Sequence, residues 1–64
     1  MSGKIRVMID DIVQKRSKGN VTIAASTKTK LILKGIDVNK YTAVSDDDPA
    51  VIKKLEDIAR EMGL

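Results

Sequence analysis

The 64-residue sequence contains no cysteine, histidine, tryptophan or phenylalanine, and its one aromatic residue is Tyr41. Without cysteine there are no disulfides, and without cysteine or histidine the commonest zinc ligands are absent. The same absences exclude a thiol nucleophile and an imidazole general base. No segment approaches the roughly 20 apolar residues of a membrane-spanning helix, and charges interrupt the first residues, where a secretory signal would need an apolar core. We therefore expect a cytoplasmic, non-enzymatic protein with no cofactor, no metal site and no membrane association.

Residues 1–64 are enough for one small domain with a thin core. Apolar residues recur at helical spacing in two stretches and predict helices at about 4–17 and 49–62. The second of these has a clear beginning and end, because Asp48 can cap it, Pro49 suits its first turn and Gly63 can end it. Its apolar face is Val51, Ile52, Leu55, Ile58, Ala59 and Met62, and that of the first helix is Ile5, Met8, Ile9, Ile12 and Val13.

The stretch from 22 to 34 is ambiguous, because it is rich in threonine, isoleucine and valine and partly alternates, as a β-hairpin would. A helix is favoured by Asn20 or Thr22 as N-cap and by Gly35 as a stop. Its expected core face is Val21, Ala24, Ala25, Lys28 (through its methylenes), Leu31 and Ile32. We therefore predict an all-α, compact three-helix domain with short connections.

The segment that follows, 36–48, combines apolar anchors with acids. Asp37 is expected to cap a short helical turn near 38–41, and Ile36, Val38 and Tyr41 to hold the segment on the core. The run 46–48 consists of three aspartates, which suit either a cation or the N-terminus of a helix. Pro49 directly after the run favours helix capping. A twelve-residue calcium-binding loop over 37–48 is disfavoured, because Thr42 stands where that loop needs glycine.

Apolar residues that lie off the predicted core faces suggest what the domain does. Val7, Ile23 and Leu33 are such residues, and we take them as the candidate protein interface. Small chains with thin cores commonly gain stability by association. The leading hypothesis is therefore a protein-interaction domain that binds a protein partner, with a homodimer or other homo-oligomer as one form of it.

The charge distribution supports a second hypothesis. Residues 1–34 carry eight Lys or Arg against two Asp, whereas residues 35–64 carry four against seven acids. The basic half could attract a nucleic acid as a helix-turn-helix-like protein. No arginine or glutamine follows the cap of the second helix to read a base, which weakens this alternative. Its candidate contacts are Lys28, Lys30, Lys34, Lys15 and Arg16.

Overall fold

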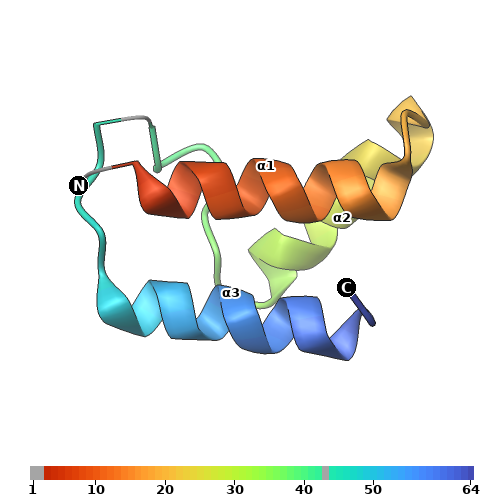
Figure 1. Cartoon of the computed structure of the whole chain (residues 1–64). Helices are drawn as coiled ribbons and strands as arrows, with labels where there is room; N and C mark the ends of the chain where they lie inside the picture. Colours follow the sequence, from red (N-terminus) through yellow and green to blue (C-terminus); the bar gives the residue numbers. More distant parts are fainter. Residues whose placement is uncertain (1–2, 43) are drawn as a thin grey trace.

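The structure, a computed structural model, describes residues 3–42 and 44–64 and contains three helices. They are α1 (Lys4–Ser17), α2 (Val21–Leu33) and α3 (Pro49–Glu61), and no strand occurs among the described residues (Figure 1). The predicted all-α three-helix domain is therefore confirmed, and the alternative hairpin at 22–34 is wrong. The helix ends differ from the predicted ones by no more than one residue.

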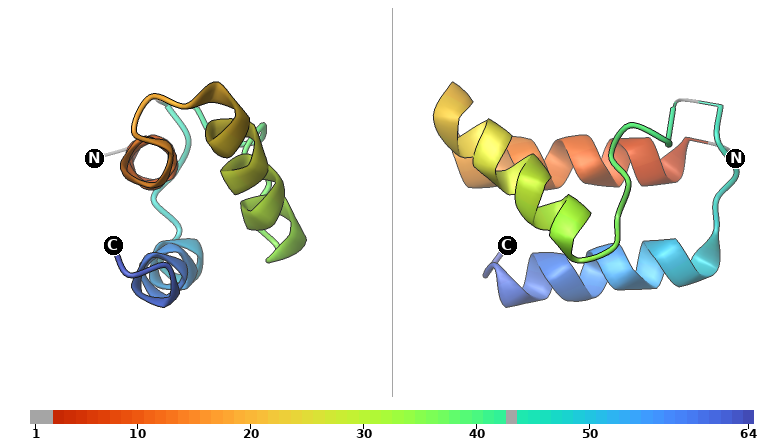
Figure 2. Two further views of the ribbon diagram at one scale, coloured as in Figure 1. Left: turned by 90° about the vertical axis from the view of Figure 1, so that its right-hand side faces the viewer. Right: turned by 180° about the vertical axis from the view of Figure 1, so that it is seen from behind.

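Helices α1 and α3 lie side by side and run in the same direction, while α2 crosses α1 obliquely (Figures 1 and 2). Two helices that run in the same direction need a long return between them. The chain from 34 to 48 makes this return, from the end of α2 to the end of the molecule where α1 and α3 both begin. The expectation of short connections is therefore wrong for this segment, although it holds for the turn at 18–20.

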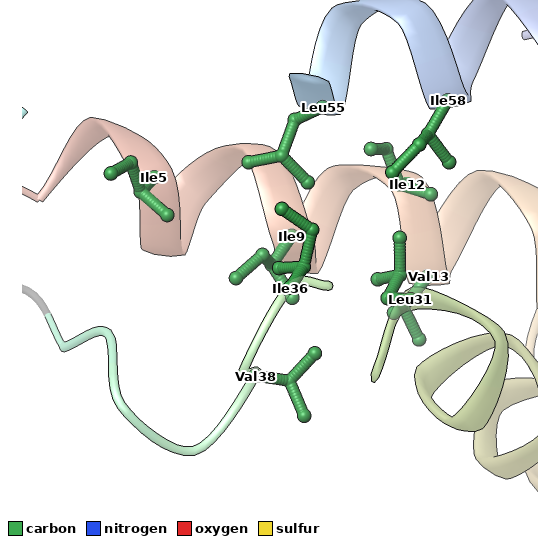
Figure 3. Close-up of a cluster of buried hydrophobic side chains, with 9 residues drawn as sticks. All are labelled: Ile5, Ile9, Ile12, Val13, Leu31, Ile36, Val38, Leu55 and Ile58. Carbon is green, nitrogen blue, oxygen red and sulfur yellow. The ribbon is translucent and has the colours of Figure 1, made fainter. Parts of the chain in front are cut away.

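The core is aliphatic and centres on α1 (Figure 3). Helix α1 contributes four of its residues, α3 contributes two and α2 only Leu31. The return segment adds Ile36 and Val38, while Tyr41 is half-buried at the edge, so these three act as the predicted anchors. The buried set is Ile5, Ile9, Ile12, Val13, Leu31, Ile36, Val38, Leu55 and Ile58.

Helix α2 turns a different face to the core from the one predicted. Ala24, Thr27 and Leu31 pack inward, and the Thr27 hydroxyl is satisfied by donating to the Ile23 carbonyl at 2.7 Å. Most of the predicted face is exposed, since Val21 is 81% exposed and Ile32 49%. Ala25 and Lys28 are exposed as well. The sequence indicated one broad apolar face, and the fold buries only one edge of it.

The acidic run caps two helices at once. Asp48 accepts from the Ala50 amide at 3.0 Å, which confirms its predicted place at the start of α3. Asp47 accepts from the Lys4 amide at 2.9 Å, at the start of α1. A second link joins the same loop to α1, because the Gly3 amide donates to the Ser45 carbonyl at 2.9 Å. Carboxylates are favourable at these two positive helix ends.

Candidate protein-interaction surface on helix α2

The exposed apolar side chains gather on α2. Of the seven large apolar residues that are exposed among the described residues, four belong to this 13-residue helix. They are Val21, Ile23, Ile32 and Leu33, and the one large apolar residue that α2 buries is Leu31. A helix that exposes more large apolar side chains than it buries either packs poorly in its own fold or carries an interaction surface.

Three of these four residues, Val21, Ile32 and Leu33, belong to one continuous surface, and Ile23 lies outside it. A helix turns 100° per residue, so Val21, Ala25, Lys28 and Ile32, spaced by four, three and four, share one side of α2. Thr29 and Leu33 lie one position further round the helix. We call these six residues the outer face of α2. All six residues are exposed, and at Lys28 the face borders a groove that Asp10 and Gln14 of α1 help to line.

Two polar details make the outer face less polar than its composition suggests. The Thr29 hydroxyl donates to the Ala25 carbonyl at 3.1 Å, so its hydrogen bond is made within the helix. Lys28 can lay its methylenes along the apolar neighbours and keep its ammonium group in water. The middle of the outer face carries the short side chains of Ala25 and Thr29 beside the longer Lys28, and bulkier apolar residues lie at both ends.

The three residues predicted as an interface do not form one patch. All are exposed, at 66% for Val7, 41% for Ile23 and 81% for Leu33. Val7 is on α1, whereas Ile23 and Leu33 are on α2, about 15 Å apart along its axis at 1.5 Å per residue. Of the three, Leu33 belongs to the outer face. Val21 and Ile32 were missed as surface residues, because helical periodicity alone assigns them to the core.

The stretch of sequence that contains α2 is cationic. No Asp or Glu lies between Asp11 and Asp37, while that stretch contains six Lys or Arg. Two of the six are paired, Lys15 with Asp11 at 3.0 Å and Lys34 with Glu61 at 2.9 Å. Within residues 3–42 and 44–64, the remaining four cations form no ion pair. They are Arg16, Lys18, Lys28 and Lys30.

The Lys34–Glu61 pair ties the end of α2 to the end of α3. The Lys34 ammonium donates a hydrogen bond to the Glu61 carboxylate, and this bond, with the charge of Lys34, lowers the pKa of Glu61. The positive charge of Lys30 acts in the same direction. Lys34 is therefore occupied in the fold and is less available to a nucleic acid than the sequence suggested.

The five predicted nucleic-acid contacts are distributed over several sides of the molecule. Lys28 and Lys30 are both exposed on α2. Residues two positions apart on a helix are separated by 200°, so these two lysines lie on opposite flanks. Arg16 lies near the end of α1, and its neighbour Lys15 is bridged to Asp11. The structure thus places no more than part of this set on any one face of α2.

Other kinds of site have less support among the described residues. The described residues contain no group of three acidic side chains arranged to hold a metal ion, and none of their helices is long and apolar enough to cross a membrane. A shallow groove of about 300 Å³ lies between α1 and α3, lined partly by Met8, Ile12, Ala59 and Leu64. Asp11 and Arg60 at its rim are each already paired with an oppositely charged side chain.

Comparison with known proteins identifies no relative: no family model, curated protein or solved structure matches the chain. The function must therefore be inferred from the surface of α2 itself.

Proposed function

We propose that this domain is a non-enzymatic interaction module that binds another protein chain through the outer face of α2. One observation carries the proposal: α2 buries a single large apolar residue, Leu31, and exposes four. Two of the four, Val21 and Ile32, share one side of the helix with Ala25, as expected of a helix that packs against another chain.

The apolar burial available here can be compared with the cost of association. Full burial of a Val, Leu or Ile side chain contributes about 1.5–3 kcal/mol. Val21 and Leu33 are each 81% exposed and Ile32 is 49% exposed, so covering all three would contribute about 3–6 kcal/mol. Association costs at least about 4 kcal/mol in lost freedom. Apolar burial alone therefore supports weak binding, and further contacts must add to it.

Two experiments test the proposal. Sedimentation equilibrium over a concentration series detects a second copy as the partner. For a different partner, a photo-crosslinking amino acid at Ala25 is used in the cells that produce the protein, with Lys53 on α3 as the control position. The captured protein is then purified, and its affinity for the uncrosslinked domain is measured.

The proposal predicts an Ile32-dependent complex. Ile32→Ser should weaken the reconstituted complex, or the self-association, at least tenfold, and Val7→Ser on α1 should leave it unchanged. Both variants should remain folded, because both residues are exposed. A complex that binds Ile32→Ser as tightly as the parent would overturn the proposal.

The alternative, nucleic-acid binding, is favoured by the stretch without acids between Asp11 and Asp37. Binding to a mixed-sequence duplex would involve phosphate contacts and fall steeply with salt. Under this alternative Lys28→Glu with Lys30→Glu abolishes duplex binding, whereas Ile32→Ser leaves it intact. The two functions thus make opposite predictions for Ile32.

A further inference from the structure

We infer, on the basis of the proposed function, that the partner of α2 is an amphipathic helix whose apolar stripe is flanked by Asp or Glu. The shape of the outer face and the charge of Lys28 within it point to such a partner. It specifies the chemistry of the partner, which the proposed function leaves open.

The shape of the outer face fits a helix. Four residues of the outer face have the four-three-four spacing with which one helix packs along another. They are Val21, Ala25, Lys28 and Ile32, and we call them the strip. Ala25 and Thr29, at the middle, are small enough to let a second backbone come close, and Val21 and Ile32 bound the strip at either end. From Val21 to Ile32 the strip is about 16 Å long at 1.5 Å per residue, which matches a partner helix of about three turns.

The charges around the strip call for acids on the partner. Lys28 lies within the strip and Lys18 three positions before Val21, whereas Lys30 lies on the opposite flank of α2 and outside the strip. Lys28 forms no ion pair among the described residues, so it can pair with a carboxylate of a partner that lies along the strip. Opposite charges across an interface favour the correct partner and speed its association.

The same features disfavour the other occupants of this surface. In a symmetric pair of α2 helices, Lys28 of one copy would approach Lys28 of the other, with no acid on either α2. On DNA, Val21, Ile32 and Leu33 would face phosphates, and no bidentate base-reading side chain accompanies them. On a lipid surface, the helix lacks the Trp or Phe that typically enters the interface.

The probe is a labelled, hydrocarbon-stapled 14-residue peptide with a Leu/Ala stripe and Glu at the flanking positions. Its matched control carries Lys in place of every flanking Glu. Fluorescence anisotropy is measured with the whole 64-residue chain at low and moderate salt. We expect the Glu peptide to bind at least tenfold more tightly than the Lys peptide, with a difference that shrinks as salt rises.

Variants of the domain test whether the peptide binds to α2. Lys28→Glu should weaken the Glu peptide at least fivefold and strengthen the Lys peptide. Ile32→Ser should weaken both peptides. Lys53→Glu, the same charge reversal on an exposed part of α3, should change neither affinity, because Lys53 lies outside the outer face.

The outcomes separate this inference from the proposed function. If both peptides bind equally and Ile32→Ser weakens both, α2 is a protein-binding surface and the preference for an acidic partner is wrong. If binding of the Glu peptide does not depend on Ile32, or if Lys53→Glu weakens it as much as Lys28→Glu does, the peptide binds elsewhere and the inference is overturned. If neither peptide binds at millimolar concentration, an acidic helix is excluded. The crosslinking experiment still decides the proposed function in that case.

Discussion

Two neighbouring residues of α2 provide the sharpest test of how this helix is oriented. Leu31 is 0% exposed, whereas Ile32, the next residue, is 49% exposed. Truncating a fully buried leucine to alanine removes its burial and leaves a cavity, at a cost of about 2–5 kcal/mol. Truncating a half-exposed isoleucine forfeits much less, and alanine's better helix propensity returns part of it. We therefore expect Ile32→Ala to cost about 1 kcal/mol or less.

The difference is large relative to the stability of so small a domain. At about 0.05–0.15 kcal/mol per residue, 64 residues give a free energy of unfolding of about 3–10 kcal/mol. Leu31→Ala should consume a large part of that or unfold the domain, and Ile32→Ala should leave it folded. Urea denaturation followed by far-UV circular dichroism measures both, with the m-value checked for constancy. Equal losses for the two variants would mean that the outer face of α2 belongs to the core, which would refute the proposed interaction surface.

Three further predictions concern the rest of the fold. Asp47→Ala, which removes the cap of α1, should lower the free energy of unfolding by about 1 kcal/mol more than Asp46→Ala does; similar urea midpoints for the two variants would contradict the cap. Lys18 has a φ of 50°, so Lys18→Gly should raise the free energy of unfolding by about 1 kcal/mol, and no gain would argue against strain there. In Lys34→Met, an NMR titration should show a higher Glu61 pKa than in the parent. Because the folded pKa of Glu61 is lowered, its stabilising contribution is present above the unfolded pKa and is lost as the pH falls through the folded value. An unchanged Glu61 titration would contradict this account.

Much of the fold could be predicted from the sequence because its signals are local. The cap at Asp48, the proline after it and the apolar spacing of α3 all act within one or two turns, and they locate the helix to within one residue. The segment after α2 is equally local. Gly35 ends the helix with a φ of 94°, as its place after the helix predicts. In the next predicted turn, near 38–41, the Asn39 amide donates to the Asp37 carboxylate at 3.0 Å.

The features that could not be predicted depend on contacts between distant segments. Asp47 caps a helix that begins 43 positions earlier in the chain, so no local pattern identifies its partner. The rotation of α2 depends on how α1 and the return segment fill the core, and both sides of the helix carry apolar residues. Thr27 was not predicted as a core residue, because a threonine hydroxyl can be buried only where it has a hydrogen-bond partner. Here that partner is the Ile23 carbonyl of the same helix.

An exposed apolar strip is a hazard for any soluble chain, because identical strips can pair with one another. Under the proposed function, the charges around α2 reduce this hazard. The helix contains lysines and no acid, so two copies brought together at this surface repel each other, while a partner that carries acids is attracted. Repulsion of the wrong partner and attraction of the right one are the two components of specificity. The lysines would therefore contribute more to the choice of partner than to the strength of binding. The apolar residues would contribute more to the strength of binding than to the choice of partner. This division is why the proposed function is tested at Ile32 and the identity of the partner at Lys28.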